Sequence, residues 1–237
     1  IPPICAYLVY QKRRELAGIH FEPSLWAYPF LACAGLAIIL GDFLGFMVFT
    51  QLAFIPIVAG ILLIFLGAKA TRTLWFSIAF LFFMIPIPPS MTQSIAFKLK
   101  LMAAEGAVIM ARFFTLPMLR EGSYIHFNND RLLVGDVCGG LRSLIALLAL
   151  GALMAYFSRS RPWARVLTFV LSAPIAIVSN MFRIFLLCIV GYFWGSKVAA
   201  GTFHDISGFF IFGCAFILFI SLEGLLRRIA PIHTTQR

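Results

Sequence analysis

Charged residues are scarce in this sequence. Only 12% of the 237 residues are Asp, Glu, Lys or Arg, while 62% are apolar. Soluble domains carry about a quarter charged residues. A water-soluble protein of this size could not bury so much apolar side chain, so that class is excluded. We therefore expect an integral membrane protein.

Acidic residues are the scarcer of the two charge types: 9 Asp and Glu stand against 19 Lys and Arg, for a formal net charge of +10. Nucleic-acid binding would need the basic residues to form a patch on a polar surface. They lie instead in short runs between apolar stretches, which is typical of membrane topology signals. The sequence thus predicts contact with membrane lipid and no nucleic-acid partner.

Long polar stretches and internal repeats are also lacking. The first ten residues resemble the end of a spanning helix whose start is missing, since a full span needs about 20 residues. Six longer apolar segments follow: residues 25–40, 46–66, 74–88, 141–157, 166–194 and 206–226. We predict an all-α, polytopic membrane helix bundle with about seven spans, the first one partial, in a single domain over residues 1–237.

The basic runs between these segments predict the topology. They lie at residues 12–14, 69–72, 159–165 and 227–237, and strict alternation of the spans puts them all on one side. The positive-inside rule makes that side cytoplasmic. Residues 90–137 then form an extracytoplasmic segment, and Asp42, between Gly41 and Gly45, marks a tight turn joining two spans.

The extracytoplasmic segment shows two patterns. From Ile95 an apolar stripe recurs at Leu99, Met102, Ile109 and Phe113, beside a charged face, which predicts an interfacial amphipathic helix. This helix either shapes a substrate entrance or is a connector lying on the surface. Further on, apolar and polar residues alternate on both sides of residues 128–130, which predicts a short β-hairpin.

A second cysteine on the outer face is missing. Four of the five cysteines lie inside apolar segments, where a cysteine usually acts as a small hydrophobe: Cys5, Cys33, Cys188 and Cys214. Cys138 differs, because it precedes a spanning helix whose positive end would favour the thiolate. The absence of a partner argues against a disulfide and against a thiol oxidase. Cys138 is either a nucleophile or a structural residue.

Arg183 lies inside an apolar run, where an arginine is costly and indicates function. The 18 residues from Arg165 to Arg183 rise about 27 Å, which places Arg183 near the outer leaflet. Asn180 shares its helical face. The alternative is that Arg183 only snorkels outward and anchors the helix.

His204 begins the last spanning segment and is therefore expected at the same face as Cys138. It is either a proton-transfer residue or an interfacial histidine. A thiol, an imidazole and a permanent cation at one depth are the groups that acyl transfer through a thioester requires. One Cys and one His without spaced carboxylates make a poor metal site, so no metal or cofactor is expected.

Three motifs, taken in order, resemble those of the exosortase/archaeosortase family of membrane transpeptidases. They are the run from Cys138 to Leu144, the Asn180–Arg183 element and the pair His204-Asp205. The stretch at residues 120–122 and the end of the first helix at residues 8–14 are also similar. Val137 and Gly139 stand where the family usually has Ala and Ser, so the resemblance does not specify the preferred sorting motif.

The resemblance implies roles for these residues. Cys138 would be the nucleophile, Arg183 the transition-state stabiliser and His204 the proton-transfer residue. Arg142, Asn180 and Asp205 are expected to bind substrate. The implied substrates are exported proteins whose C-terminal tail combines a Pro-Glu-Pro-like motif, a hydrophobic helix and a basic end. The implied acceptor nucleophile is unidentified.

Arg142 lies four residues after Cys138, which on a continuous helix would put the two on one face. The implied location is the bacterial inner membrane, with the site facing the periplasm. Full-length relatives would have about eight spans.

Two other functions remain open from the residues alone. A transporter or channel could use Arg183 and Asp42 along its pathway. No pair of broken helices indicates the inverted repeat of many transporters. A membrane assembly subunit without catalytic activity is the other alternative.

Overall fold

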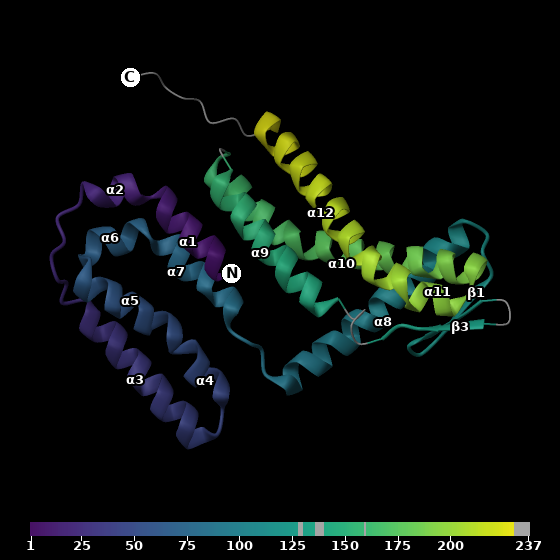
Figure 1. Cartoon of the computed structure of the whole chain (residues 1–237), viewed down its shortest axis with the longest axis horizontal. Coiled ribbons are helices and arrows are strands. Elements are labelled where there is room, and N and C mark those ends of the chain that lie inside the picture. The colour runs from purple at the N-terminus through teal and green to yellow at the C-terminus, as the bar shows by residue number, and fades with distance from the viewer. Residues whose placement is uncertain (128–129, 136–139, 159, 230–237) are drawn as a thin grey trace. The chain divides into compact units, whose positions relative to one another are not determined.

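The computed structural model describes residues 1–127, 130–135, 140–158 and 160–229, which are mostly helical (Figure 1). The chain divides into two compact units, Ile1–Pro89 and Ser90–Arg237. Within the described residues, four helical stretches are long and apolar enough to cross a membrane: Ala27–Leu44, Met47–Phe65, Pro162–Trp194 and Ile206–Leu226. Two shorter apolar stretches are Trp75–Met84 and Leu141–Phe157. The predicted all-α polytopic membrane fold is confirmed.

In the part of the chain that the structure describes, the first unit consists of seven α-helices of 5 to 18 residues and a 3-10 turn. They are α1 (Pro2–Gln11), α2 (Arg13–Ala17), α3 (Ala27–Leu44), α4 (Met47–Leu52), α5 (Phe54–Phe65), α6 (Gly67–Thr73), α7 (Trp75–Phe80) and the 3-10 turn η1 (Leu81–Met84). α3 and α5 pack closely: a Cβ added at Gly60 would lie 2.7 Å from Leu31. The turn predicted at Asp42 is centred on Gly45, whose φ of +68° ends α3, while Asp42 belongs to the helix.

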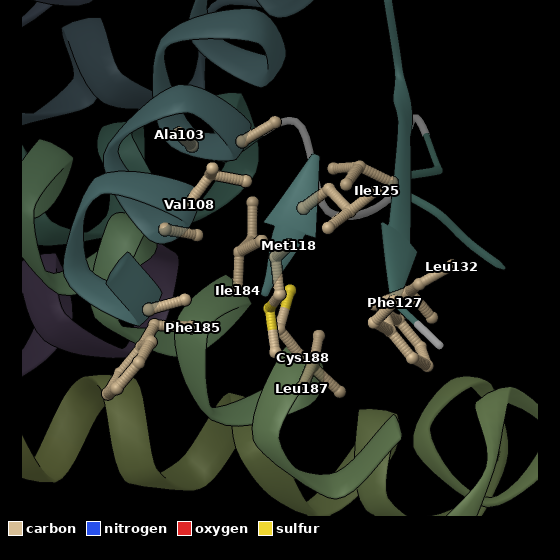
Figure 2. Packing of buried hydrophobic residues seen from close by; sticks show 14 of the residues in the cluster. Ala103, Val108, Met118, Ile125, Phe127, Leu132, Ile184, Phe185, Leu187 and Cys188 are labelled. Atoms are coloured by element: carbon tan, nitrogen blue, oxygen red, sulfur yellow. The ribbon is translucent and has the colours of Figure 1, made fainter. Parts of the chain in front are cut away.

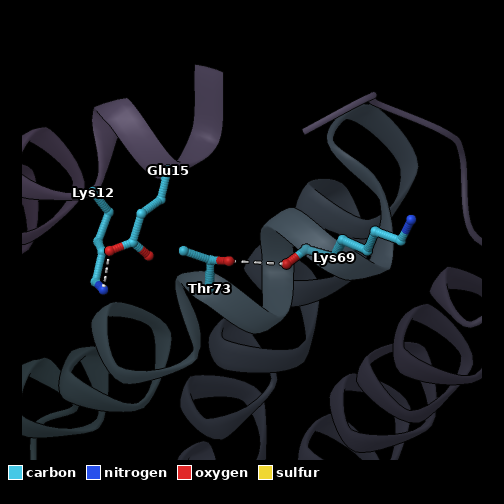
Figure 3. Close-up of polar contacts among 4 residues, drawn as sticks. All are labelled: Lys12, Glu15, Lys69 and Thr73. Atoms are coloured by element: carbon cyan, nitrogen blue, oxygen red, sulfur yellow. Dashed lines mark hydrogen bonds and ion pairs between the residues drawn. The ribbon is translucent and has the colours of Figure 1, made fainter. Parts of the chain in front are cut away.

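Two exposed polar contacts of the first unit join residues three or four positions apart. The Lys12 Nζ lies 2.6 Å from the Glu15 carboxylate, one turn along the chain. The Thr73 hydroxyl donates to the Lys69 carbonyl, and the Lys69 ammonium extends away from Thr73 (Figure 3). These exposed contacts lie at two of the basic runs that predict the topology, and exposed pairs of this kind contribute little to stability.

The second unit holds longer helices and a small sheet. Its elements are α8 (Pro89–Phe113), β1 (Met118–Glu121), β2 (Tyr124–Phe127), β3 (Asp130–Leu133), α9 (Leu141–Phe157), α10 (Pro162–Trp194), α11 (Ser196–Ala200) and α12 (Thr202–Ile229). α10 packs against both α9 and α12.

The strands form an antiparallel sheet in the order β1-β2-β3. The predicted hairpin corresponds to β2 and β3, with Phe127 opposite Asp130. β1 was not predicted. It pairs with β2 through a two-residue loop, in which Gly122 has the positive φ, +58°, that such loops favour at their first position.

An apolar cluster joins α8, the sheet and the C-terminal third of α10 (Figure 2). The face of α8 that packs there is formed by alanines and Val108, and a Cβ added at Gly106 would lie 2.6 Å from the Met181 sulfur. The predicted amphipathic helix is therefore present, but most of its bulky stripe is exposed. Small residues let helix backbones approach closely, which leaves the larger side chains facing outward.

Candidate active site

Arg183 is buried inside the second unit, with 8% of its surface exposed. Its Nε donates a hydrogen bond of 2.9 Å to the Oγ of Ser207, which is itself 1% exposed. Arg183 belongs to α10 and Ser207 to α12, so the bond links two spanning helices. A guanidinium held in this way faces the protein interior instead of snorkelling toward water.

α10 is long enough to place Arg183 beyond the middle of a membrane. Its 33 residues span about 50 Å, against about 30 Å for the hydrocarbon core. Just after Arg183, the side chains of Ile184, Phe185, Leu187 and Cys188 enter the cluster formed with α8 and the sheet (Figure 2). This packing fixes the rotation of α10 next to Arg183.

Gly140 brings the start of α9 against α10. It is the N-cap of α9 and has a φ of +76°. A Cβ added there would lie 2.4 Å from the Asn180 amide nitrogen, so only glycine fits without displacing Asn180. Its carbonyl accepts a hydrogen bond of 2.9 Å from the Ser143 hydroxyl.

A cavity of about 10 Å³ lies beside this contact. Its walls come from α8, the start of α9 and α10, and include Leu99, Ala103 and Leu144 in addition to Gly140 and Asn180. About one water-sized sphere fills such a space. α8 therefore covers the junction between Gly140 and Asn180.

Cys138, the predicted nucleophile, lies outside the described residues, two positions before Gly140. The side chains of His204 and Asp205 also lie outside the described part of the chain, although both residues belong to the first turns of α12. Ser207 follows His204 by three residues, about one helical turn. Described residues at or near the first and third motifs, Gly140 and Ser207, thus contact the second motif on α10, at Asn180 and at Arg183.

Arg142 does not have the helical relation to Cys138 that the spacing suggested. α9 begins at Leu141, and Gly140 before it is left-handed, so no continuous helix connects positions 138 and 142. The Arg142 side chain is exposed in the first turn of α9.

Sequence reasoning missed Ser207. Serine is common in membrane helices and its burial depends on the neighbouring helix, so composition gave no indication. The available signal was its spacing: Ser207 stands three residues after His204, as Arg183 stands three residues after Asn180. Of the cysteines that the structure describes, all four lie in helices and none forms a disulfide.

The transmembrane exosortase family matches residues 1–221 of the chain, which is nearly its whole length. The chain therefore belongs to this family. Its members are multi-pass membrane proteins of the protein-sorting transpeptidase type, and their substrates are exported proteins with sorting signals. No curated protein and no solved structure matches the chain.

Proposed function

We propose that this protein is a membrane cysteine transpeptidase that cleaves exported proteins within a C-terminal sorting tail. Cys138 is the nucleophile, His204 the proton-transfer residue and Arg183 the oxyanion stabiliser. The observation that supports this assignment is the meeting of the three motifs' described neighbours at α10: Gly140 against Asn180, and Ser207 bonded to Arg183.

The reaction proceeds through a thioester. His204 takes the thiol proton of Cys138 and becomes an imidazolium. The Cys138 thiolate attacks the scissile carbonyl carbon, forming a C–S bond and moving the carbonyl π electrons onto oxygen. Arg183 stabilises this oxyanion, because its guanidinium is a permanent cation with several donors. Collapse of the intermediate breaks the C–N bond, and the imidazolium of His204 gives its proton to the leaving amine. An acceptor nucleophile then gives its proton to the now neutral His204 and attacks the thioester carbonyl, and the C–S bond breaks to release Cys138.

The substrate tail combines a Pro-Glu-Pro-like motif, a hydrophobic helix and a basic end. Asn180, Arg142 and Asp205 bind the segment near the scissile bond. Asn180 is the best supported of the three, because it is buried in contact with Gly140, two residues after the nucleophile.

The active site faces the periplasmic side of a bacterial inner membrane, as the positive-inside rule indicates. A cysteine introduced at Arg161, an exposed position in the same basic run, should therefore resist an impermeant thiol reagent added to intact cells. Its labelling from outside would reverse the topology.

The decisive experiment compares Cys138→Ala and Cys138→Ser with wild type. Each is co-expressed with an exported test protein that carries such a tail, and the processed fraction is measured. We expect Cys138→Ala to abolish processing while the tail still binds. Cys138→Ser should lose almost all activity, because a hydroxyl is far less acidic than a thiol.

Cys33→Ala is the matched control, since Cys33 is exposed on α3 and should not matter. Membrane abundance is checked for each variant. Wild-type processing by Cys138→Ala at normal abundance would end the transpeptidase hypothesis.

A further inference from the structure

The hydrogen bond between Arg183 and Ser207 uses a particular donor of the guanidinium. An arginine has five N–H donors, one on Nε and two on each terminal nitrogen. Ser207 accepts from Nε, the donor nearest the side-chain stem, at 2.9 Å. Because the group is planar and rigid, fixing Nε and the stem also fixes the plane in which both terminal nitrogens lie.

The position of Ser207 along the chain adds to this constraint. Ser207 lies 24 residues after Arg183, on α12, the helix that also carries His204 one turn earlier. The bond therefore fixes the orientation of the Arg183 guanidinium relative to α12, the helix that carries His204. Both bonded residues, Arg183 and Ser207, are buried. An arginine side chain without such a bond, by contrast, populates many rotamers.

We infer that Ser207 is a positioning residue for the reaction: its hydroxyl holds Arg183 by Nε and so sets the plane of the guanidinium that stabilises the oxyanion. This inference rests on the proposed role of Arg183. Ser207 does not touch the substrate, and it acts only through the arginine. Its effect should thus appear where the oxyanion forms, in the chemical step, and hardly in substrate binding.

The first experiment measures single-turnover cleavage of a tailed test protein by the purified full-length enzyme. Ser207→Ala should lower the cleavage rate about ten- to a hundredfold, the range expected for a misplaced catalytic group. The substrate concentration at half-maximal rate should stay within about twofold. Ser207→Thr keeps the hydroxyl and should recover most of the rate.

Ser221→Ala serves as the matched control, because Ser221 lies on the same helix with an exposed side chain. It should cleave at the wild-type rate. A merely structural role for Ser207 would lower membrane abundance, or affect binding and rate alike.

The second experiment tests whether Ser207 acts through Arg183. Lysine has no group that corresponds to the Nε–H of arginine. Arg183→Lys therefore removes the donor of the hydrogen bond to the Ser207 hydroxyl. In the Arg183→Lys background, Ser207→Ala should then lower the cleavage rate by less than about threefold. In wild type, the same substitution should lower it about ten- to a hundredfold. Non-additivity of this kind identifies two residues that act as one unit.

Three results would overturn the inference: a wild-type cleavage rate for Ser207→Ala, an undiminished loss in the lysine background, or poor membrane abundance of Ser207→Ala. Failure of the proposed function would appear differently, as continued processing by Cys138→Ala whatever residue stands at 207.

Discussion

The two units of the chain bury different kinds of residue. Among the described residues, the first unit buries one polar side chain, Ser77. The second unit buries nine: Lys100, Ser158, Ser160, Thr168, Ser172, Ser179, Asn180, Arg183 and Ser207. Polar groups are costly inside a membrane protein and are retained where they contribute to packing or function. Among the described residues, the buried polar side chains, Arg183 included, thus concentrate in the second unit.

Most of these buried polar residues belong to α10 and follow a helical spacing. Thr168, Ser172, Ser179 and Arg183 are separated by four, seven and four residues and so share one face. The small members allow close helix packing: a Cβ added at Gly151 of α9 would lie 2.4 Å from the Ser172 Cβ. The same face that packs the bundle thus carries Arg183 into its interior.

Among substitutions of described residues in the two units, Arg183→Lys should cause the largest loss of processing. Lysine keeps the charge but loses the planar fork, and removal of one oxyanion donor costs about a hundred- to a thousandfold in rate. Processing of a tailed test protein measures the loss. Arg142→Ala, at an exposed position, should be milder than Arg183→Ala. An Arg183→Lys enzyme with wild-type activity would remove the arginine from the mechanism.

Gly140→Ala should have the next largest effect. Alanine at a φ of +76° is strained by about 1–2 kcal/mol, and its Cβ would displace the Asn180 amide. We expect cleavage to fall roughly ten- to a hundredfold, because the nucleophile lies two residues away. Gly213→Ala, on α12 with open space around it, is the control. Equal activity of the two variants would show that the contact between Gly140 and Asn180 does not contribute to cleavage.

Asp130→Asn should have a small effect that depends on pH. The backbone N–H and hydroxyl of Ser196, together with the Arg131 N–H, lower the pKa of Asp130. Because the pKa of Asp130 is lower in the folded state, the ionised carboxylate stabilises the fold when the pH is above the ordinary pKa of the carboxyl. This contribution disappears as the pH falls through the pKa of the folded state. Thermal unfolding in detergent should show wild type above Asp130→Asn at pH 7 and the two converging below about pH 4. A pH-independent difference would contradict this account.

Asp42→Asn should have the smallest effect, because Asp42 is exposed on α3 in the first unit. Processing should stay within about twofold of wild type, the range typical of surface substitutions. A large loss at normal abundance would break the comparison, because it would place a residue needed for processing in the first unit.

Periodic features were predictable from sequence, and features that depend on neighbours were not. The long apolar helices and the β2–β3 hairpin follow from local patterns of hydrophobicity. β1 was missed because a four-residue strand with one buried side chain, Met118, has too little alternation to be recognised. The packing face of α8 was missed because alanines contribute less to a hydrophobic pattern than the bulky residues of the predicted stripe. Close approach of α8 to α10 nevertheless requires these small residues.

The sequence by itself determined the membrane class and the three motifs that resemble the family's, because composition and short-range spacing carry that information; the sidedness stays a prediction from the basic runs. Only the tertiary structure decided that Arg183 faces inward, that Gly140 abuts Asn180 and that Ser207 holds the guanidinium. These contacts depend on how α9, α10 and α12 are rotated and separated. That arrangement results from side-chain packing between residues far apart in the chain, such as the 24 positions between Arg183 and Ser207.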